Sequence, residues 1–287
     1  MLINAKEMLK KALAKKYAVA QININNLEWT KTALEVAEEV KSPIILGVTE
    51  GAAKYMGGWK TVTGMVNGLI SDLGITVPVA LHVDHGSSIE AVKAAMDAGF
   101  TSIMYDGSHD PIEKNVADTK TVVEYAATKN VSVEAEVGTV GGTEDGITGG
   151  VNYASLEECV AISETGIDML AASLGSVHGD YVGEPKLGFD KMVEYSAATK
   201  LPLVLHGGSG IPDDMIKRAI ESGQSKINVN TEVQQAFGRG ISQYVNEGLV
   251  DKGTGFDPRK VNGTYAVPEM KEIIKTKLTL FGSVGKA

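Results

Sequence analysis

Short apolar runs alternate with longer amphipathic segments eight times along this chain, and this repetition limits the fold more than any other feature. The runs start about 23 to 37 residues apart, the length of one strand, one helix and two loops. They cover residues 18–23, 43–48, 78–83, 101–106, 131–136, 168–174, 202–206 and 225–230. Runs that are apolar on both sides indicate parallel strands covered by helices outside and packed within. Eight such units predict an α/β fold, a (β/α)8 TIM barrel, rather than an open doubly wound sheet.

The segments between and beyond these runs predict helices and loops. Residues 28–40, 89–98, 113–129 and 213–222 have the periodicity of covering helices. Residues 1–16 predict an extra N-terminal helix, and residues 268–281 a C-terminal helical extension. We expect a polar loop at 247–264 and a frayed glycine-rich end at 282–287. Because no linker rich in proline, serine or charge divides the chain, we expect residues 1–287 to form a single barrel domain.

Charge and cysteine content narrow the classes of function. The net charge of −9 provides no basic field, so we expect no nucleic acid partner. No apolar run approaches membrane-spanning length, and the amphipathic N-terminus does not resemble a signal peptide, so we expect no membrane partner. A single cysteine, Cys159, fits the reducing cytoplasm. The absence of Gly-x-Gly-x-x-Gly after the first run weakens a dinucleotide-binding interpretation.

The ends of the predicted strands carry the chemistry, because catalytic groups of such barrels come from the carboxyl ends of different strands. These ends hold Asn23 and Asn25, Thr49 and Glu50, Asp84 and His85, Asp106, Glu134 and Glu136, His178, His206, and Asn228, Asn230 and Thr231. His85, His178 and His206 could share one metal ion with a coordination position left open, as in catalytic zinc sites. We expect His82 to support this site from behind and His109 to lie in a surface turn.

Two carboxylates and two glycine-rich segments complete the candidate site. Asp106 and Glu136 could ligate a second metal position, although hydrogen bonds to neighbouring backbone would explain them nearly as well. Residues 138–150 contain six glycines but lack the Gly-Lys-Ser/Thr ending of a P-loop, so we interpret them as a mobile lid that carries Glu144. Phosphate binding is better placed at His206-Gly207-Gly208-Ser209-Gly210 and Asn228-Val229-Asn230-Thr231, each of which leads into a helix.

With these motifs the chain resembles the class II, metal-dependent fructose-1,6-bisphosphate aldolases and their tagatose-bisphosphate relatives. The resemblance runs nearly end to end, through residues 23–28, 81–87, 133–136, 141–145, 176–179, 205–210, 226–231 and 257–259. Each segment alone is weak, but the combination is specific.

The resemblance implies a role for each of these residues. It implies one catalytic Zn²⁺ on His85, His178 and His206, with Asp106 and Glu136 matching a second metal position. Asp84 would act as general acid and base on the C4 hydroxyl, and Glu144 would handle the proton at C3. Substrate contacts would come from Asn25, Thr49, Gly179, Gly207, Gly208, Ser209, Asn228, Asn230 and Thr231, beside a possible Na⁺ or K⁺. Arg259 would reach from a neighbouring subunit to the other phosphate, which implies a homodimer or homotetramer.

The implied reaction is the reversible cleavage of fructose 1,6-bisphosphate to dihydroxyacetone phosphate and glyceraldehyde 3-phosphate, in glycolysis and gluconeogenesis. A divalent cation can stabilise the enediolate that this cleavage leaves. No lysine stands at a predicted strand exit, which argues against an imine mechanism. Alternatives are a tagatose-1,6-bisphosphate aldolase, a metal-dependent hydrolase of barrel fold and a non-catalytic binding protein. Val182 stands where many members have lysine, and the loss of this cation should weaken substrate binding unless Lys186 substitutes. Thr49 stands where many have serine, and it keeps the hydroxyl.

Overall fold

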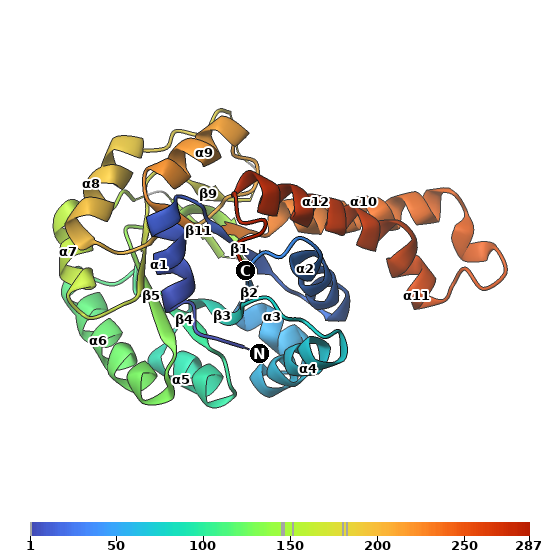
Figure 1. Cartoon of the computed structure of the whole chain (residues 1–287), viewed down its shortest axis with the longest axis horizontal. Coiled ribbons are helices and arrows are strands. Elements are labelled where there is room, and N and C mark those ends of the chain that lie inside the picture. Colours follow the sequence, from blue (N-terminus) through green and yellow to red (C-terminus); the bar gives the residue numbers. More distant parts are fainter. Residues whose placement is uncertain (1, 145–146, 151, 180, 182) are drawn as a thin grey trace.

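Eight parallel strands close into a barrel, which confirms the predicted (β/α)8 architecture (Figure 1). The structure is a computed structural model that describes residues 2–144, 147–150, 152–179, 181 and 183–287. The strands are β1 (Val19–Asn23), β2 (Ile44–Val48), β3 (Val79–Gly86), β4 (Ser102–Tyr105), β5 (Ser132–Val137), β8 (Met169–Ala172), β10 (Leu203–Leu205) and β11 (Gln224–Val229). Their order around the barrel is β1-β11-β10-β8-β5-β4-β3-β2, and the pairing of β1 with β11 closes it.

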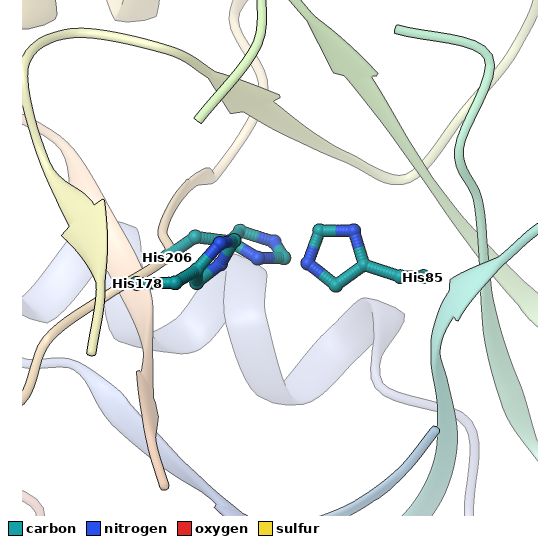
Figure 2. Close-up of side chains that lie close together, drawn as sticks. All are labelled: His85, His178 and His206. Carbon is teal, nitrogen blue, oxygen red and sulfur yellow. The ribbon is translucent and has the colours of Figure 1, made fainter. Parts of the chain in front are cut away.

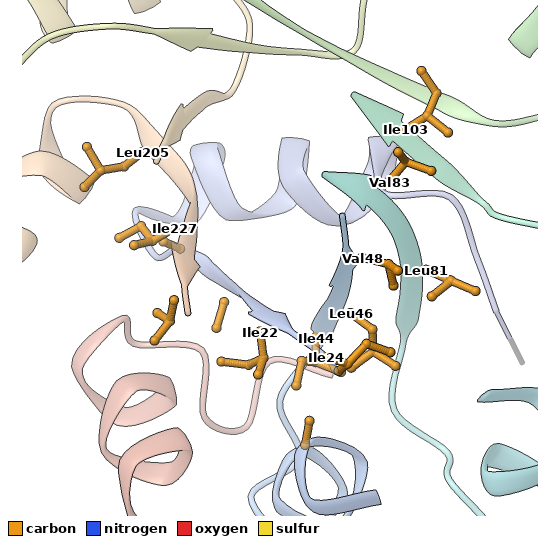
Figure 3. Packing of buried hydrophobic residues seen from close by; sticks show 14 of the residues in the cluster. Ile22, Ile24, Ile44, Leu46, Val48, Leu81, Val83, Ile103, Leu205 and Ile227 are labelled. Atoms are coloured by element: carbon orange, nitrogen blue, oxygen red, sulfur yellow. The ribbon is translucent and has the colours of Figure 1, made fainter. Parts of the chain in front are cut away.

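Helices cover the outside of the barrel. They are α2 (Leu27–Glu39), α3 (Glu50–Tyr55), α4 (Trp59–Asp72), α5 (Ile89–Asp97), α6 (Ile112–Lys129), α7 (Leu156–Ser163), α8 (Phe189–Thr199), α9 (Asp213–Glu221) and α10 (Thr231–Asn246). The buried residues that alternate outward from the strands, such as Ile22, Leu46 and Leu81, form one apolar cluster with the inner faces of these helices (Figure 3). Within the part of the chain that the structure describes, no helix combines the length and apolar character needed to cross a membrane.

The interior of the barrel changes from apolar at its floor to polar at its rim. Leu9 of α1 (Lys6–Lys15) clusters with Val19, Ile45 and Val204, which lie near the starts of their strands, so α1 closes the amino-terminal end. Above this floor many inward positions are polar, and Lys226 is fully buried there. The expectation of strands that are apolar on both sides was therefore wrong for the interior. These polar side chains are tolerated because they bond to one another, as in the 2.8 Å contact between Lys226 Nζ and Glu134 Oε2.

The expected loop at 247–264 was correct for residues 252–257 but wrong for residues 258–264, which are helical. After α10 follow the 3-10 helix η1 (Leu249–Asp251), α11 (Pro258–Val261), the π-helix η2 (Asn262–Ala266) and α12 (Val267–Leu280), which with α10 form an arm that extends from the barrel (Figure 1). Gly240 of α10 makes this packing possible, since a Cβ atom there would lie 2.4 Å from Ala266 Cα. The Tyr244 hydroxyl also donates to Gly255 O at 2.9 Å.

The C-terminal segment 282–287, which we expected to fray, is attached to the barrel. The backbone N–H of Gly285 donates to Val40 O at 3.0 Å, and that of Ala287 donates to Lys41 O at 3.1 Å. Ser283 is fully buried and its hydroxyl oxygen lies 2.8 Å from that of Ser42. These long-range hydrogen bonds pair backbone groups that would bond only to water if the end were frayed.

A small second sheet lies beside the barrel, and two of its three strands fall within residues 138–150, the region expected to form a lid. β6 (Gly141–Glu144) pairs antiparallel with β7 (Ile147–Gly149) and parallel with β9 (Val177–His178). Gly142 has a φ of 95°, and a Cβ atom there would lie 2.1 Å from His178 O, so only glycine allows this approach.

Candidate metal and anion site at the barrel rim

A bulge near the end of β3 directs two consecutive residues to the rim of the barrel. Regular alternation would place Asp84 and His85 on opposite faces of the strand. Instead, the register between β3 and β4 shifts between Val83 and Gly86, and His85 has a φ of 52° in the left-handed region. Bulges re-aim side chains in this way, and such a backbone conformation costs about 1 to 3 kcal/mol. The strained backbone of His85 thus lies where the side chains of Asp84 and His85 enter the candidate site.

Three imidazoles meet at this rim, as the sequence predicted. One nitrogen atom from each of His85, His178 and His206 lies within 4.8 Å of the others. The ring centroids are 5.1 Å apart for His85 and His178, 4.6 Å for His85 and His206, and 5.7 Å for His178 and His206. Figure 2 shows the rings facing a common point from different elements of the chain. They come from β3, from β9 and from the residue that follows β10.

A carboxylate orients His85. Asp106 Oδ2 lies 2.7 Å from His85 Nδ1, so Nε2 is the nitrogen that would bind an ion. Glu136 Oε2 lies 4.0 Å from the same Nδ1, and His85, Asp106 and Glu136 form a second group that could hold a metal. Both predicted carboxylates therefore lie at the site. Asp106 is hydrogen-bonded to the side chain of His85 through one oxygen, and the backbone N–H of Ser108 donates to its other oxygen at 3.0 Å.

A buried ion pair orients His206. Its Nε2 lies 2.9 Å from Glu134 Oε1, and the second oxygen of Glu134 accepts from Lys226 Nζ at 2.8 Å. Because an ionised carboxylate can only accept a hydrogen bond, this contact indicates the tautomer with hydrogen on Nε2 and leaves Nδ1 as the ligand nitrogen. Burial would raise the pKa of Glu134, but Lys226 and His206 outweigh it and lower the pKa to about 2. His82 lies behind the three histidines, as expected, and its Nε2 is 3.6 Å from Glu134 Oε2.

The charges around these histidines favour a cation. Burial would lower the pKa of His85, but its hydrogen bond to Asp106 and the charges of Asp84 and Glu136 raise it well above the ordinary value. Burial and the charge of Asp106 raise the pKa of Glu136 well above its ordinary value. Glu136 Oε2 is buried and has no hydrogen-bond partner among the described residues. Clustered carboxylates beside three imidazoles are the donor set of a divalent metal site, so the residues fit such an ion.

Asp84 is held as an ionised carboxylate beside the histidines. Its Oδ2 accepts from the Asn23 side chain at 2.8 Å, and its Oδ1 accepts from the Asn228 side chain at 3.2 Å. Burial alone would raise the pKa of Asp84, but the positive charges of His85 and Lys226 hold it well below its usual range. The geometry therefore presents a fixed, charged base at the rim.

Two cavities open beside the histidines. The first, of about 130 Å³, is lined by Asn23, Ile24, Asn25, Thr49, Ala52, His178, Gly179, Gly207, Ser209, Asn228, Asn230, Thr231 and Gln234. The second, of about 420 Å³, is lined by Thr49, Glu50, His85, Ser87, Asp106, Ser108, His109, Asp110, Glu136, Thr139, Val140, Gly142 and His178. Eight of the predicted substrate contacts lie in the first cavity, in which small and neutral polar groups dominate. Such a lining is suited to binding an anion through N–H and O–H donors.

Some predicted residues are not in this cluster. Gly208 does not line either cavity, and its N–H donates to Asn228 O at 3.0 Å, which holds residues 207–210 against β11. Arg259 lies on the arm, 88% exposed at its side chain, and pairs with Asp257. His109 is exposed in a turn, as expected, although it also borders the second cavity. The side chain of Glu144, and the whole of Val182, lie outside the residues that the structure describes.

Sequence reasoning missed the polar interior that supports the site. Lys226 stands in the middle of β11, so a search limited to strand exits passed over it, and its amine is paired with Glu134. Asn23 was noted at a strand end but given no role, although it holds Asp84. The signal was present, since polar and apolar residues alternate through Gln21 to Asn25 and through Lys226 to Asn230.

Comparison with known proteins gives consistent matches over the whole length. Residues 3–286 match the family model described as fructose-bisphosphate aldolase class-II. The chain is 58% identical to the fructose-bisphosphate aldolase of Geobacillus stearothermophilus, over 100% of this chain and 99% of the relative. It is 54% identical to the 6-phospho-5-dehydro-2-deoxy-D-gluconate aldolase of Halalkalibacterium halodurans, over 100% of this chain and 98% of the relative. The crystal structure of the YdjI aldolase from Escherichia coli K12 superposes with a TM-score of 0.86 at 33% identity, covering 100% of both chains.

Proposed function

This chain belongs to the class II fructose-bisphosphate aldolase family, and on that premise we propose that it cleaves fructose 1,6-bisphosphate reversibly into dihydroxyacetone phosphate and glyceraldehyde 3-phosphate, as a step of glycolysis and gluconeogenesis. The enzyme is an aldehyde-lyase by its family. The observation that carries the proposal is the convergence of His85, His178 and His206 beside the ionised Asp84 at the barrel rim. Neither a hydrolase nor a binding protein is supported by the matches.

The three histidines would hold Zn²⁺, and Asp106 with Glu136 would offer a second metal position. Bound there, the ion would supply electrophilic stabilisation for negative charge that develops on substrate oxygens. The protein's own contribution is orientation: Asp106 holds His85, and Glu134 holds His206. Lys226 cannot act as an imine-forming amine while its charge is buried against Glu134.

Asp84 would move the proton at the C4 hydroxyl of the sugar. Removing this proton lets the C3–C4 bond break, with the C4 oxygen becoming the aldehyde and the bonding electrons passing to C3. The side chains of Asn23 and Asn228 hold both carboxylate oxygens in place, so the base needs no rearrangement before it reacts. Glu144 would return a proton to C3, as the family resemblance implies.

The first cavity would bind the phosphate of the dihydroxyacetone phosphate half. Gly179, Gly207, Ser209, Asn230 and Thr231 line it, and α10 begins at Thr231, where its N-terminal dipole favours an anion. Asn25, Thr49 and Asn228 line the same cavity and would contact the carbon chain. A Na⁺ or K⁺ ion beside the phosphate remains part of the proposal. We assign no substrate contact to the amide of Gly208, since the structure pairs it with Asn228 O.

The second cavity would accept the aldehyde half, and it needs a cation from outside. No lysine or arginine belongs to the residues described as lining it. Arg259, exposed on the arm, would supply this charge to the site of a neighbouring subunit, so we propose a homodimer or homotetramer. We also propose that residues 1–287 form one domain and act in the cytoplasm, where Cys159, buried and free, would stay reduced.

A second candidate substrate comes from the relative of Halalkalibacterium halodurans. In 6-phospho-5-dehydro-2-deoxy-D-gluconate, the ketone at C5 beside the phosphate at C6 matches the ketone and phosphate of fructose 1,6-bisphosphate. Cleavage between C3 and C4 would release the same dihydroxyacetone phosphate, with a three-carbon aldehyde acid in place of the triose phosphate. The first cavity would serve both substrates. The comparisons name fructose bisphosphate and this sugar acid, and they do not favour the tagatose alternative.

The test is a side-by-side measurement of kcat/KM on fructose 1,6-bisphosphate, tagatose 1,6-bisphosphate and the sugar acid, with zinc-loaded protein and a coupled assay for triose phosphates. The proposal expects the highest value for fructose 1,6-bisphosphate. It also expects chelator to abolish cleavage, added Zn²⁺ to restore it, and borohydride to trap no substrate on the protein. Full activity in excess chelator would contradict the metal mechanism, and a dominant sugar acid activity would transfer the assignment to the second candidate.

A further inference from the structure

An ion pair stands directly behind the wall of the first cavity. Lys277 Nζ lies 2.7 Å from Glu232 Oε2 and donates to Glu232 Oε1 at 2.8 Å. Lys277 belongs to α12 and Glu232 to the first turn of α10, 45 positions apart in the sequence. The two side chains are only 9% and 22% exposed. Neither residue lines the cavity, although the neighbouring Thr231 does.

Glu232 is bonded to the loop formed by residues 207–210. Its Oε1 accepts from the backbone N–H of Gly210 at 2.6 Å, and its own N–H donates to Ser209 Oγ at 3.4 Å. At the other end of the loop, the Tyr181 hydroxyl donates to Gly207 O at 2.9 Å. Gly207 and Ser209 both line the cavity, so Glu232 and Tyr181 hold the loop from outside while its inner side faces the cavity.

This arrangement creates an electrostatic conflict. A carboxylate in the first turn of α10 suits the helix dipole, but it also places a negative charge next to the cavity that would receive a phosphate. Repulsion between like charges is poorly screened where side chains are largely buried. Lys277 lies against both oxygens of Glu232 and cancels this charge.

We propose that Glu232 and Lys277 are positioning residues for the phosphate of the substrate. The carboxylate holds the Gly210 amide and thereby the loop, and the ammonium group of Lys277 keeps this support from repelling the phosphate dianion. The inference rests on the proposed function, because it takes the first cavity as the phosphate site. It adds two residues that contact the loop and each other but do not contact the substrate.

The experiment compares Lys277→Met with the double variant Lys277→Met/Glu232→Gln, all zinc-loaded. Binding of dihydroxyacetone phosphate and of dihydroxyacetone, which lacks the phosphate, is measured by titration without turnover. Lys277→Met should weaken dihydroxyacetone phosphate binding on the order of tenfold, equivalent to about 1.4 kcal/mol, and leave dihydroxyacetone binding unchanged. The double variant should recover most of the affinity, because the amide oxygen of glutamine still accepts from Gly210 while the uncompensated charge is gone.

Two further variants separate charge from packing. Lys277→Arg should retain the affinity, since it keeps the cation. Lys275→Met is the matched control: it removes an exposed lysine of the same helix, paired with Glu39 at 2.7 Å, and should change neither ligand's binding. In turnover, Lys277→Met should raise KM with kcat within about twofold of the parent, the signature of lost binding that is equal in ground and transition states.

Three outcomes would overturn the inference. Lys277→Met could bind dihydroxyacetone phosphate as well as the parent, it could lose both ligands equally, or the double variant could be no better than the single one. Each would reduce the pair to a contact that docks α12 on the barrel. Failure of the proposed function looks different: the parent protein itself would then form no triose phosphate from the bisphosphates, whatever Lys277 does.

Discussion

Removing one partner of the buried ion pair between Lys226 and Glu134 should strongly destabilise the barrel. Both side chains are fully buried, and Lys226 Nζ lies 2.8 Å from Glu134 Oε2. Lys226→Met would leave the Glu134 carboxylate buried with its cation removed, which typically costs about 3 to 5 kcal/mol. The same pair lowers the pKa of Glu134, because Lys226 and His206 outweigh the effect of burial, so the carboxylate is charged in the parent protein. For a chain of this size, the melting temperature should fall by roughly 5 to 8 °C.

The assay is thermal and urea unfolding of the metal-free protein, so that metal loading does not mask the effect. The matched control is Lys114→Met, because Lys114 also bonds two carboxylates, Asp110 and Asp118, each at 2.7 Å. Its side chain is 56% exposed, so this loss should cost at most about 1 kcal/mol. If the two variants are destabilised equally, or if Lys226→Met costs less than the control, burial does not set the strength of this pair and the reasoning fails.

Three further predictions concern the rim and the barrel exterior. Asp84→Asn should lower kcat for cleavage by on the order of a thousandfold while zinc content, measured by metal analysis, stays at the parent level. Gly142→Ala should weaken zinc binding in a chelator competition, because its Cβ atom would lie 2.1 Å from His178 O; unchanged affinity would show that β6 does not position the histidine. Glu38 accepts from Thr76 N–H at 2.7 Å, and its bond to Lys41 lowers its pKa from 4.5 to about 2. Glu38→Gln should therefore cost about 1 kcal/mol at pH 7, and the difference from the parent should vanish as the pH falls from 4.5 to about 2, since the parent loses this stabilisation on protonation.

Much of the barrel could be predicted because its strands are marked locally. Runs such as 43–48 are short, apolar and regularly spaced, and helix starts carry side-chain caps, such as Asn26 for α2 and Ser88 for α5. The errors lie where distant contacts decide. The segment 258–264 is polar, yet it is helical and leads into α12, and Gly240 leaves room for Ala266 against α10. The C-terminal residues are glycine-rich, yet hydrogen bonds to Val40 and Lys41 hold them.

The candidate metal ligands could be predicted because the fold brings strand ends together whatever their separation in sequence. His85, His178 and His206 followed from that rule alone. Their orientation did not follow. The bulge that turns His85 beside Asp84 depends on the register between β3 and β4, and the choice of ligand nitrogen on His206 depends on Glu134, 72 positions away.

The sequence by itself determined the repeated strand and helix units, the barrel they close and the set of groups at its rim, because hydrophobic periodicity and residue chemistry are local properties. Only the tertiary structure decided which partner each buried polar group has. Lys226 with Glu134, Lys277 with Glu232 and Asn23 with Asp84 are pairs between separate elements. The same physical reason explains all three pairs: a charged or amide group that is removed from water needs a hydrogen-bond partner within the protein. Packing in three dimensions, rather than spacing along the chain, decides which residue that partner is.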